Sequence, residues 1–459
     1  MPKKLNILKY EKEKRGADMY IIGNGRLITR DDAMPYLENG AVAVKGTKIV
    51  EVGETKALLR RYPEAQFIDA RGLVIMPAFI NAHSHIYSAL ARGLSIKGHN
   101  PQNFYEILDG MWWKIDRNLT REFTRRSAYQ TYLDCIKTGC TTLIDHHASY
   151  CEVEGSLFEL EAVAKELGVR TSLCYEVSDR DGEEKCKAAI KENADFITHC
   201  ENQNDPMVKA MFGLHAAFTL SDKTLDACAE ANNGRVGFHV HVAEGMDDVY
   251  DSLRNHGTRT VNRLLNHGIL GDKTLLIHCI HLNAAEMDII KETNGMVVNN
   301  PESNMGNAVG CSPVLEMFKR GLLVGLGTDA YTYDMLESLK VALIIQRHNA
   351  CLPNVGWMEA TQMLFKNNPR IMSRFFDEPL GVLKAGAAAD VIVMDYKPFT
   401  PFGAENVDGH MIFGMTGRQC ETVVANGRLL MHDRQLVGID EQEINAKTHE
   451  AAKRLWAAL

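Results

Sequence analysis

The stretch GLVIMPAFINAHSH, residues 72–85, decides the fold that this sequence predicts. It is an apolar, β-rich run that ends in two histidines, a pattern typical of a buried strand with polar side chains at its carboxyl end. Seven more such segments lie at residues 140–147, 170–177, 207–216, 235–244, 274–280, 295–301 and 322–330, most of them followed by an amphipathic helical stretch. Eight strand–helix units predict an α/β fold with a (β/α)8 TIM-like barrel over residues 71–384.

The two ends of the chain share a second pattern. Residues 19–70 and 385–440 contain short apolar strands broken by Asn-Gly and Lys-Gly turns, without a helical period. Neither segment can bury a face alone, so they predict one small β-sandwich domain built from both ends. Residues 1–18 are interpreted as a disordered or extended tail, with Met19 as an alternative start to Met1, and residues 441–459 as a C-terminal helix.

Length, charge and cysteine content exclude several classes of protein. A chain of 459 residues suits a large barrel with an added domain. A formal net charge of −8 gives no support for nucleic-acid binding, and no apolar run is long enough to cross a membrane. The eleven cysteines contain no Cys-x-x-Cys pair, which predicts free thiols in a cytoplasmic protein. The oligomeric state stays open, with a homodimer as one outcome.

Polar side chains gather at the ends of the predicted strands and predict a metal site. His83 and His85 lie two residues apart on the first strand and therefore face the same way. His241 ends the fifth strand and Asp329 ends the eighth. Three imidazoles and a carboxylate suit one divalent ion, with Zn²⁺ favoured over Fe²⁺.

Two further residues follow strands five and six and predict proton transfer. Glu244 comes three residues after His241, where a carboxylate can take a proton from an activated water and deliver it to a leaving nitrogen. His278 ends the sixth strand and is a candidate for polarising the substrate, while Asp329 can also orient the water. His239 is interpreted as a hydrogen-bonded core histidine one layer deeper in the barrel.

At these residues the sequence resembles the amidohydrolase superfamily, from about residue 19 to the end. The matching pieces are MPAFINAHSH at 76–85, HVAE at 241–244, IHC at 277–279, NPESN at 300–304 and GTD at 327–329. Within the superfamily it is most similar to mononuclear deaminases of purines and related heterocycles. A closer similarity is to the SsnA-type aminohydrolases. The segments that carry it are WW at 112–113, IDHHAS at 144–149, SNM at 303–305 and FGM at 413–415.

The resemblance implies roles for named residues. His83, His85, His241 and Asp329 would be the ligands of one metal, and Glu244, His278 and Asp329 the catalytic groups. The implied substrate contacts are Arg92, His146, His215, Ser303 and Asn304.

Departures from the family narrow the expected chemistry. The fourth strand has no lysine at its end, which favours one metal over two. The segment after Ser303 and Asn304 lacks the Leu-Lys-Leu of nucleoside-type deaminases, which argues against adenosine-like substrates. The expected function is deamination of a small purine-like heterocycle in purine or urate catabolism. One alternative is hydrolytic ring opening of a cyclic amide in an oxidised or reduced purine. The other is a non-catalytic scaffold barrel, which need not keep Glu244 together with all four ligands.

Overall fold

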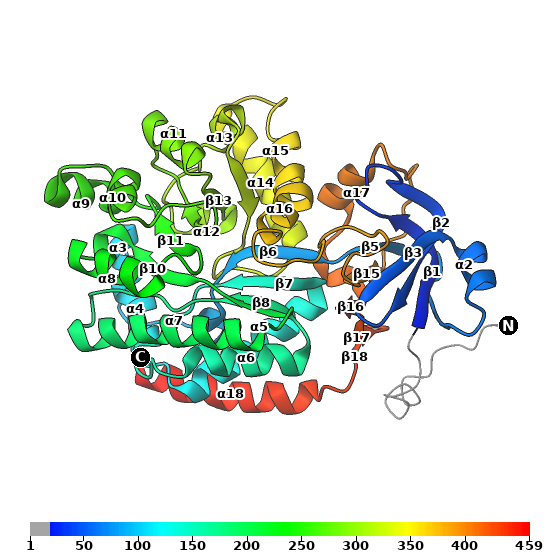
Figure 1. Cartoon of the computed structure of the whole chain (residues 1–459), viewed down its shortest axis with the longest axis horizontal. Helices are drawn as coiled ribbons and strands as arrows, with labels where there is room; N and C mark the ends of the chain where they lie inside the picture. The colour runs from blue at the N-terminus through cyan, green and yellow to red at the C-terminus, as the bar shows by residue number, and fades with distance from the viewer. Residues whose placement is uncertain (1–18) are drawn as a thin grey trace.

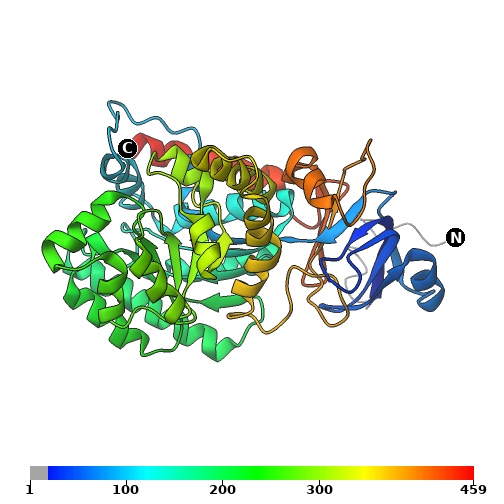
Figure 2. The ribbon, with the colours of Figure 1, turned by 90° about the horizontal axis from the view of Figure 1, so that it is seen from above.

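The structure is a computed structural model that describes residues 19–459, so the expected tail at residues 1–18 lies outside the described residues. Figure 1 shows a barrel at the left and a small β domain at the right. The same two parts stand side by side from above (Figure 2). Within residues 19–459, no helix is both long and apolar enough to cross a bilayer.

The barrel forms from two parallel sheets that meet along both edges. Its strands are β6 (Phe79–Ser84), β7 (Cys140–Asp145), β8 (Arg170–Leu173), β9 (Val208–Ala210), β10 (Phe212–Ala216), β11 (Phe238–Val242), β12 (Leu275–His278), β13 (Met296–Asn299) and β14 (Leu323–Leu326). Parallel bridges join Val177 to Leu214 and Ser84 to Asp329, between the two sheets. Because β9 and β10 share the fourth position, the predicted eightfold α/β barrel is confirmed.

Helices follow the strands and cover the barrel. They include α5 (Arg121–Thr138), α6 (Ser156–Leu167), α7 (Glu183–Gln203), α8 (Asp222–Asn232), α9 (Met246–His256), α10 (Thr260–Asn266), α11 (Ala284–Glu292), α12 (Pro301–Gly306), α13 (Val314–Arg320) and α14 (Met335–Ala350). Local sequence sets their ends: the Thr120 side chain accepts a hydrogen bond at the start of α5, and Gly139 ends that helix in the left-handed region. The shorter α3 (Phe104–Ile107) and α4 (Trp113–Asp116) precede α5 and lie with α9 at the left end of the barrel (Figure 1).

The small domain is one sheet from both chain ends. Its strands are β1 (Met19–Ile28), β2 (Tyr36–Lys45), β3 (Lys48–Glu54), β4 (Gln66–Asp69), β5 (Val74–Pro77), β15 (Val391–Met394), β16 (Cys420–Ala425), β17 (Arg428–His432) and β18 (Gln435–Leu436). Side chains from most of these strands share one buried apolar cluster, so the sheet curves around its own core. The expected pairing of the two chain ends beside the barrel is confirmed.

The segment expected as a single first strand over residues 72–83 is two strands. Val74–Pro77 pairs with β1 and β15 in the small domain, and only Phe79–Ser84 enters the barrel. Proline has no backbone N–H, so the ladder with β15 ends at Pro77 and the chain crosses to the barrel at Ala78. Periodicity could not show this division because both strands are fully buried.

The last helix, α18 (Glu441–Ala458), returns from the small domain along the outside of the barrel (Figures 1 and 2). Its Trp456 donates an indole hydrogen bond to the carbonyl of Leu90, at 2.7 Å. The C-terminus is therefore fixed to the barrel next to the segment that follows β6.

A buried ion pair between Arg170 of β8 and Asp390 links the barrel to the small domain.

Candidate metal centre and active site

Four side chains from three strands form the metal-ligand cluster, which comprises His83, His85, His241 and Asp329. The Nε2 atom of His85 lies 3.2 Å from Nε2 of His241 and 3.3 Å from Oδ1 of Asp329. Nε2 of His83 lies 4.0 Å from the same oxygen. Four tetrahedral ligands at about 2.1 Å from one ion lie about 3.4 Å apart. The spacing of the cluster therefore fits a single ion.

Hydrogen bonds orient the imidazoles of the metal-ligand cluster. His85 and His241 each direct Nδ1 to a backbone carbonyl, at 2.6 and 2.7 Å. Nδ1 of His83 lies 2.9 Å from Nε2 of His239, so His239 supports the cluster from the deeper layer. Nε2 of His83 is buried and has no hydrogen-bond partner. Burial lowers the pKa of His83, His85 and His241, which keeps these rings neutral and ready to bind a cation.

Close backbone contact brings Asp329 to His83. The N–H groups of Thr328 and Asp329 both donate to the carbonyl of His83, at 3.0 Å each. A Cβ on Gly327 would stand 2.9 Å from Cβ of His83 and 2.4 Å from Oδ1 of Asn300. Only glycine therefore lets the two barrel edges meet at this point. Asp329 itself has a φ of 56°, and such strained residues gather at functional sites.

Glu244 and His278 lie beside the metal-ligand cluster. Nε2 of His278 is 3.3 Å from Oε2 of Glu244 and 3.5 Å from Oδ2 of Asp329, and has no hydrogen-bond partner of its own. Nδ1 of His278 lies 2.7 Å from Oδ1 of Asn304, while Ser303 donates to Asp329 at 2.5 Å. Burial, with Asp329 nearby, raises the pKa of Glu244 well above its ordinary value. Glu244 can therefore hold a proton at neutral pH.

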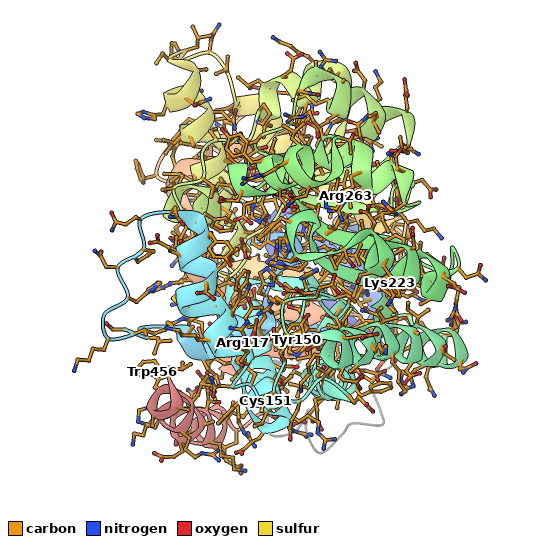
Figure 3. The ribbon with its side chains drawn as sticks, turned by 90° about the vertical axis from the view of Figure 1, so that its left-hand side faces the viewer. Arg117, Tyr150, Cys151, Lys223, Arg263 and Trp456 are labelled. Atoms are coloured by element: carbon orange, nitrogen blue, oxygen red, sulfur yellow. The ribbon has the colours of Figure 1, made fainter. Side chains whose placement is uncertain are left out.

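A second buried group, the carboxylate cluster, comprises Asp116, Glu176 and Arg180. Nη2 of Arg180 lies 3.3 Å from Oε1 of Glu176, and Nη1 lies 3.3 Å from Oδ1 of Asp116. The guanidinium also lies over the Tyr150 ring, 4.4 Å from its centroid. Figure 3 faces this end of the barrel and labels Tyr150, together with Arg117, which follows Asp116 in the chain.

One cavity joins the two clusters. It is lined by His85, Tyr87, Phe104, Leu108, Trp112, Glu176, His215, His241, Glu244, Asn307, Asp329 and Ala330. The lining combines aromatic and aliphatic side chains with ionisable groups. This combination suits a flat heterocycle that carries a few polar substituents.

Comparison with known proteins identifies the family. A sequence model described as the amidohydrolase family matches residues 74–430. The chain belongs to the amidohydrolase family. It is a hydrolase that acts on carbon–nitrogen bonds other than peptide bonds. A second model, described as an imidazolonepropionase-like composite domain of bacteria, matches residues 40–65 in the small domain, away from the cavity of this amidohydrolase.

Curated relatives and solved structures agree with this family. A 5'-deoxyadenosine deaminase of Methanobrevibacter smithii is 30% identical over 429 residues, covering 91% of this chain and 94% of the relative. A 5-methylthioadenosine/S-adenosylhomocysteine deaminase of Pelotomaculum thermopropionicum is 27% identical over 445 residues, 95% of this chain and 98% of the relative. The structure of an adenosine deaminase from Xanthomonas campestris with bound zinc gives a TM-score of 0.85 at 21% identity, covering 96% and 99% of the two chains. That likeness shows the shared fold.

The implied substrate contacts of this amidohydrolase do not all lie at the cavity. His215 lines the cavity, and Ser303 and Asn304 contact catalytic groups behind it. His146 is fully buried beneath the cavity. Arg92 is not brought to the site: its side chain is 62% exposed and pairs with Asp134 at 2.7 Å. The turn Ile86–Ala91 after β6 carries Arg92 outward, so its place in the sequence did not reveal its direction.

Several residues of the cavity were missed by sequence reasoning. Glu176 lies three residues beyond the end of β8, as Asp329 lies three residues beyond the end of β14. A polar residue at the end of the predicted strand 170–177 was the signal that could have found it. Tyr87, Phe104 and Trp112 offered no such signal, since aromatic residues in helical turns are ordinarily part of a core.

Proposed function

We propose that this chain is a mononuclear, metal-dependent aminohydrolase that removes the amino group of a purine base or purine nucleoside. The observation that carries the proposal is that His85, His241, Asp329 and Glu244 line one cavity, with ligand atoms of His83 and His278 within 4.8 Å of members of this set. A non-catalytic scaffold would have no need to keep all six side chains in register.

His83, His85, His241 and Asp329 are the proposed ligands of one divalent ion. The donor set of three neutral imidazoles and one carboxylate, with the unpartnered Nε2 of His83, fits zinc. The zinc in the adenosine deaminase of similar fold supports the same choice. When bound, such an ion lowers the pKa of water and polarises an amidine carbon.

The proposed proton carrier is Glu244. Expulsion of an amide-like anion at neutral pH is prohibitive, so the leaving nitrogen must be protonated as it departs. Glu244 is buried and lines the cavity, and burial raises its pKa well above the ordinary value, which favours the protonated form. His278, 3.3 Å away through Nε2, is placed to polarise the substrate next to it. Asp329 is oriented by Ser303, which fixes the carboxylate toward both groups.

The proposed substrate class is an amino-purine, as a base or a nucleoside. Two relatives at 27–30% identity bear the names of adenosine compounds. The missing Leu-Lys-Leu after Asn304 argues the other way and favours a base or an altered nucleoside. The SsnA-type resemblance supports a place in purine breakdown, which is part of the proposal.

Metal analysis and an ammonia-release assay test the proposal. We expect about one zinc per chain and ammonia release from guanine, adenosine or 5'-deoxyadenosine. His281→Gln, at a half-buried histidine outside the cavity, is the control and should keep both. A ring-opened product formed without ammonia would replace deamination with cyclic-amide hydrolysis. A metal-loaded protein inactive on all three purines would reject the substrate class.

A further inference from the structure

The cavity beside the metal-ligand cluster has an unbalanced charge. Three carboxylates line it, from Glu176, Glu244 and Asp329, whereas no lysine or arginine is among its described lining residues. The adjoining recess next to Phe104 and His215 also lacks both residue types within the described chain. Apart from the ion proposed at the metal-ligand cluster, the described lining therefore offers an anionic substituent no cation to pair with.

Of the three carboxylates that line the cavity, Glu176 is the one without a role in the proposed deamination. It is 3% exposed and lines the same cavity as Glu244. Although burial raises its pKa, the groups around it, His215, His146 and Arg180, lower the pKa below the ordinary value. Of these three neighbours only Arg180 carries a permanent charge, and its Nη2 lies 3.3 Å from Oε1 of Glu176.

Arg180 directs both terminal nitrogens to carboxylates, and its remaining donor, Nε, is buried without a hydrogen-bond partner. Its guanidinium contacts Asp116 and Glu176, and Nη1 lies 3.3 Å from Oδ2 of Asp181. Its side chain is 6% exposed and is not part of the cavity lining. Arg180 therefore fixes the charge and position of Glu176 from behind, and Glu176 alone presents that charge to the cavity.

The nearest imidazole leaves an acceptor open beside Glu176. Nε2 of His146 lies 3.0 Å from the carbonyl of Leu214 and 3.2 Å from that of His239. Carbonyls only accept, so Nε2 carries the ring proton. Nδ1 of His146 is buried without a hydrogen-bond partner, 3.5 Å from Oε2 of Glu176. Within the described chain, Nδ1 of His146 thus has Glu176 as its neighbour and no hydrogen-bond partner.

We propose that Glu176 is a substrate-specificity residue, whose carboxylate accepts a hydrogen bond from an N–H or O–H group of a neutral purine and disfavours anionic substituents. The inference rests on the proposed function, which supplies the purine. Arg180 is a positioning residue for this carboxylate. Discrimination comes from the buried charge, because a ligand without the donor leaves Glu176 desolvated and unpaired.

Binding and turnover of matched ligands test the role of Glu176. Dissociation constants by titration calorimetry and ammonia release are measured on zinc-loaded protein with guanine against 9-methylguanine, adenosine against 2'-deoxyadenosine, and adenosine against adenosine 5'-monophosphate. In the unchanged protein we expect at least about a tenfold preference for the donor in one of the first two pairs, and at least about a hundredfold against the phosphate. In Glu176→Gln, the preference for the ligand with the donor should fall to within about threefold, and the discrimination against the phosphate should fall by about tenfold.

Two further variants separate specificity from structure. Asp116→Asn makes the same change on the other partner of Arg180, outside the cavity lining, and should leave the ligand ratios unaltered. Glu176→Asp keeps the charge and should retain part of the preference if the amide variant does not fold. Unaltered ratios in a folded, zinc-loaded Glu176 variant, or equal effects from Asp116→Asn, would overturn the proposal, as would a panel that does not bind. Donor-dependent binding without ammonia release would instead reject deamination and leave the role of Glu176 standing.

Discussion

The metal-ligand cluster and the carboxylate cluster adjoin the same cavity, but they differ in whether their buried polar atoms have partners within the chain. The first leaves Nε2 of His83, and Nε2 of the adjacent His278, buried without partners. The second surrounds its charges with opposite ones, since Arg180 contacts Asp116, Glu176 and Asp181. Unpaired buried acceptors indicate a place for a group from outside, whereas a paired network indicates a charge fixed in advance.

We expect removal of a proposed metal ligand to have the largest effect on activity. A small effect would contradict the distinction between the two clusters. His241→Ala deletes one of four ligands, so we expect loss of zinc and a fall in turnover of at least roughly 10³-fold. The measurements are metal content per chain and ammonia release. His281→Ala is the control and should retain both. Full zinc content in His241→Ala would move the ion to other side chains.

The next effect concerns Glu244, which belongs with the metal-ligand cluster by position but is not proposed to bind the ion. Glu244→Gln keeps its size but cannot shuttle a proton, so we expect normal zinc content and a fall in turnover of at least about a hundredfold. Metal analysis beside steady-state rates checks this. Near-normal turnover would pass the proton role to His278 or Asp329, and loss of zinc would make Glu244 a ligand.

The carboxylate cluster should respond through stability. Arg180→Met leaves two buried carboxylates without their cation, and such breaks cost about 3–5 kcal/mol. We expect the lower end, because burial raises the pKa of Asp116 to about 7 and part of its charge is already neutralised at pH 7. Denaturant unfolding measures the change. Arg117→Met, at a more exposed arginine that pairs with Asp181, is the control and should cost less than about 1 kcal/mol.

The last effect is a trend with pH that is small at each step, and it concerns Asp145, at the end of β7. Burial raises its pKa to about 8, and its Oδ2 has no hydrogen-bond partner. The native state therefore binds a proton that the unfolded chain releases near pH 4, so this group destabilises the fold increasingly between about pH 4 and pH 8. Asp145→Asn removes that dependence.

Unfolding curves across pH should show the variant gaining on the unchanged protein, by up to about 1 kcal/mol per pH unit, up to pH 8 and not beyond. Asp195→Asn, at an exposed aspartate paired with Lys191, should show no such trend. A gain that is constant across pH would mean that Asp145 is ionised throughout.

The two clusters also differ in how far the sequence could predict them. His83, His85, His241 and Asp329 follow apolar strands, and parallel strands in a barrel bring their carboxyl ends together, so position along the chain predicted proximity. The direction of Arg92 depends on a turn after β6, which carries no periodic signal. The pairing of Arg180 with Asp116 joins the loop between β8 and α7 to the short helix α4 and depends on tertiary packing alone. The eight barrel strands could be predicted because each is an apolar run. The division of residues 72–83 into β5 and β6 at Pro77 could not be predicted, because it depends on which strands the two halves pair with.

That split has a consequence for synthesis of the protein. β5 pairs with β15, so the strand that leads into the barrel depends on a strand near the other end of the chain. A ribosome delivers β1–β5 long before β15 emerges. The first sheet must therefore remain incomplete, with an open edge, throughout elongation of the barrel. Its closure is a late event with a high cost in loop-closure entropy, and the exposed edge of β5 is the part of the nascent chain that a chaperone would need to shield.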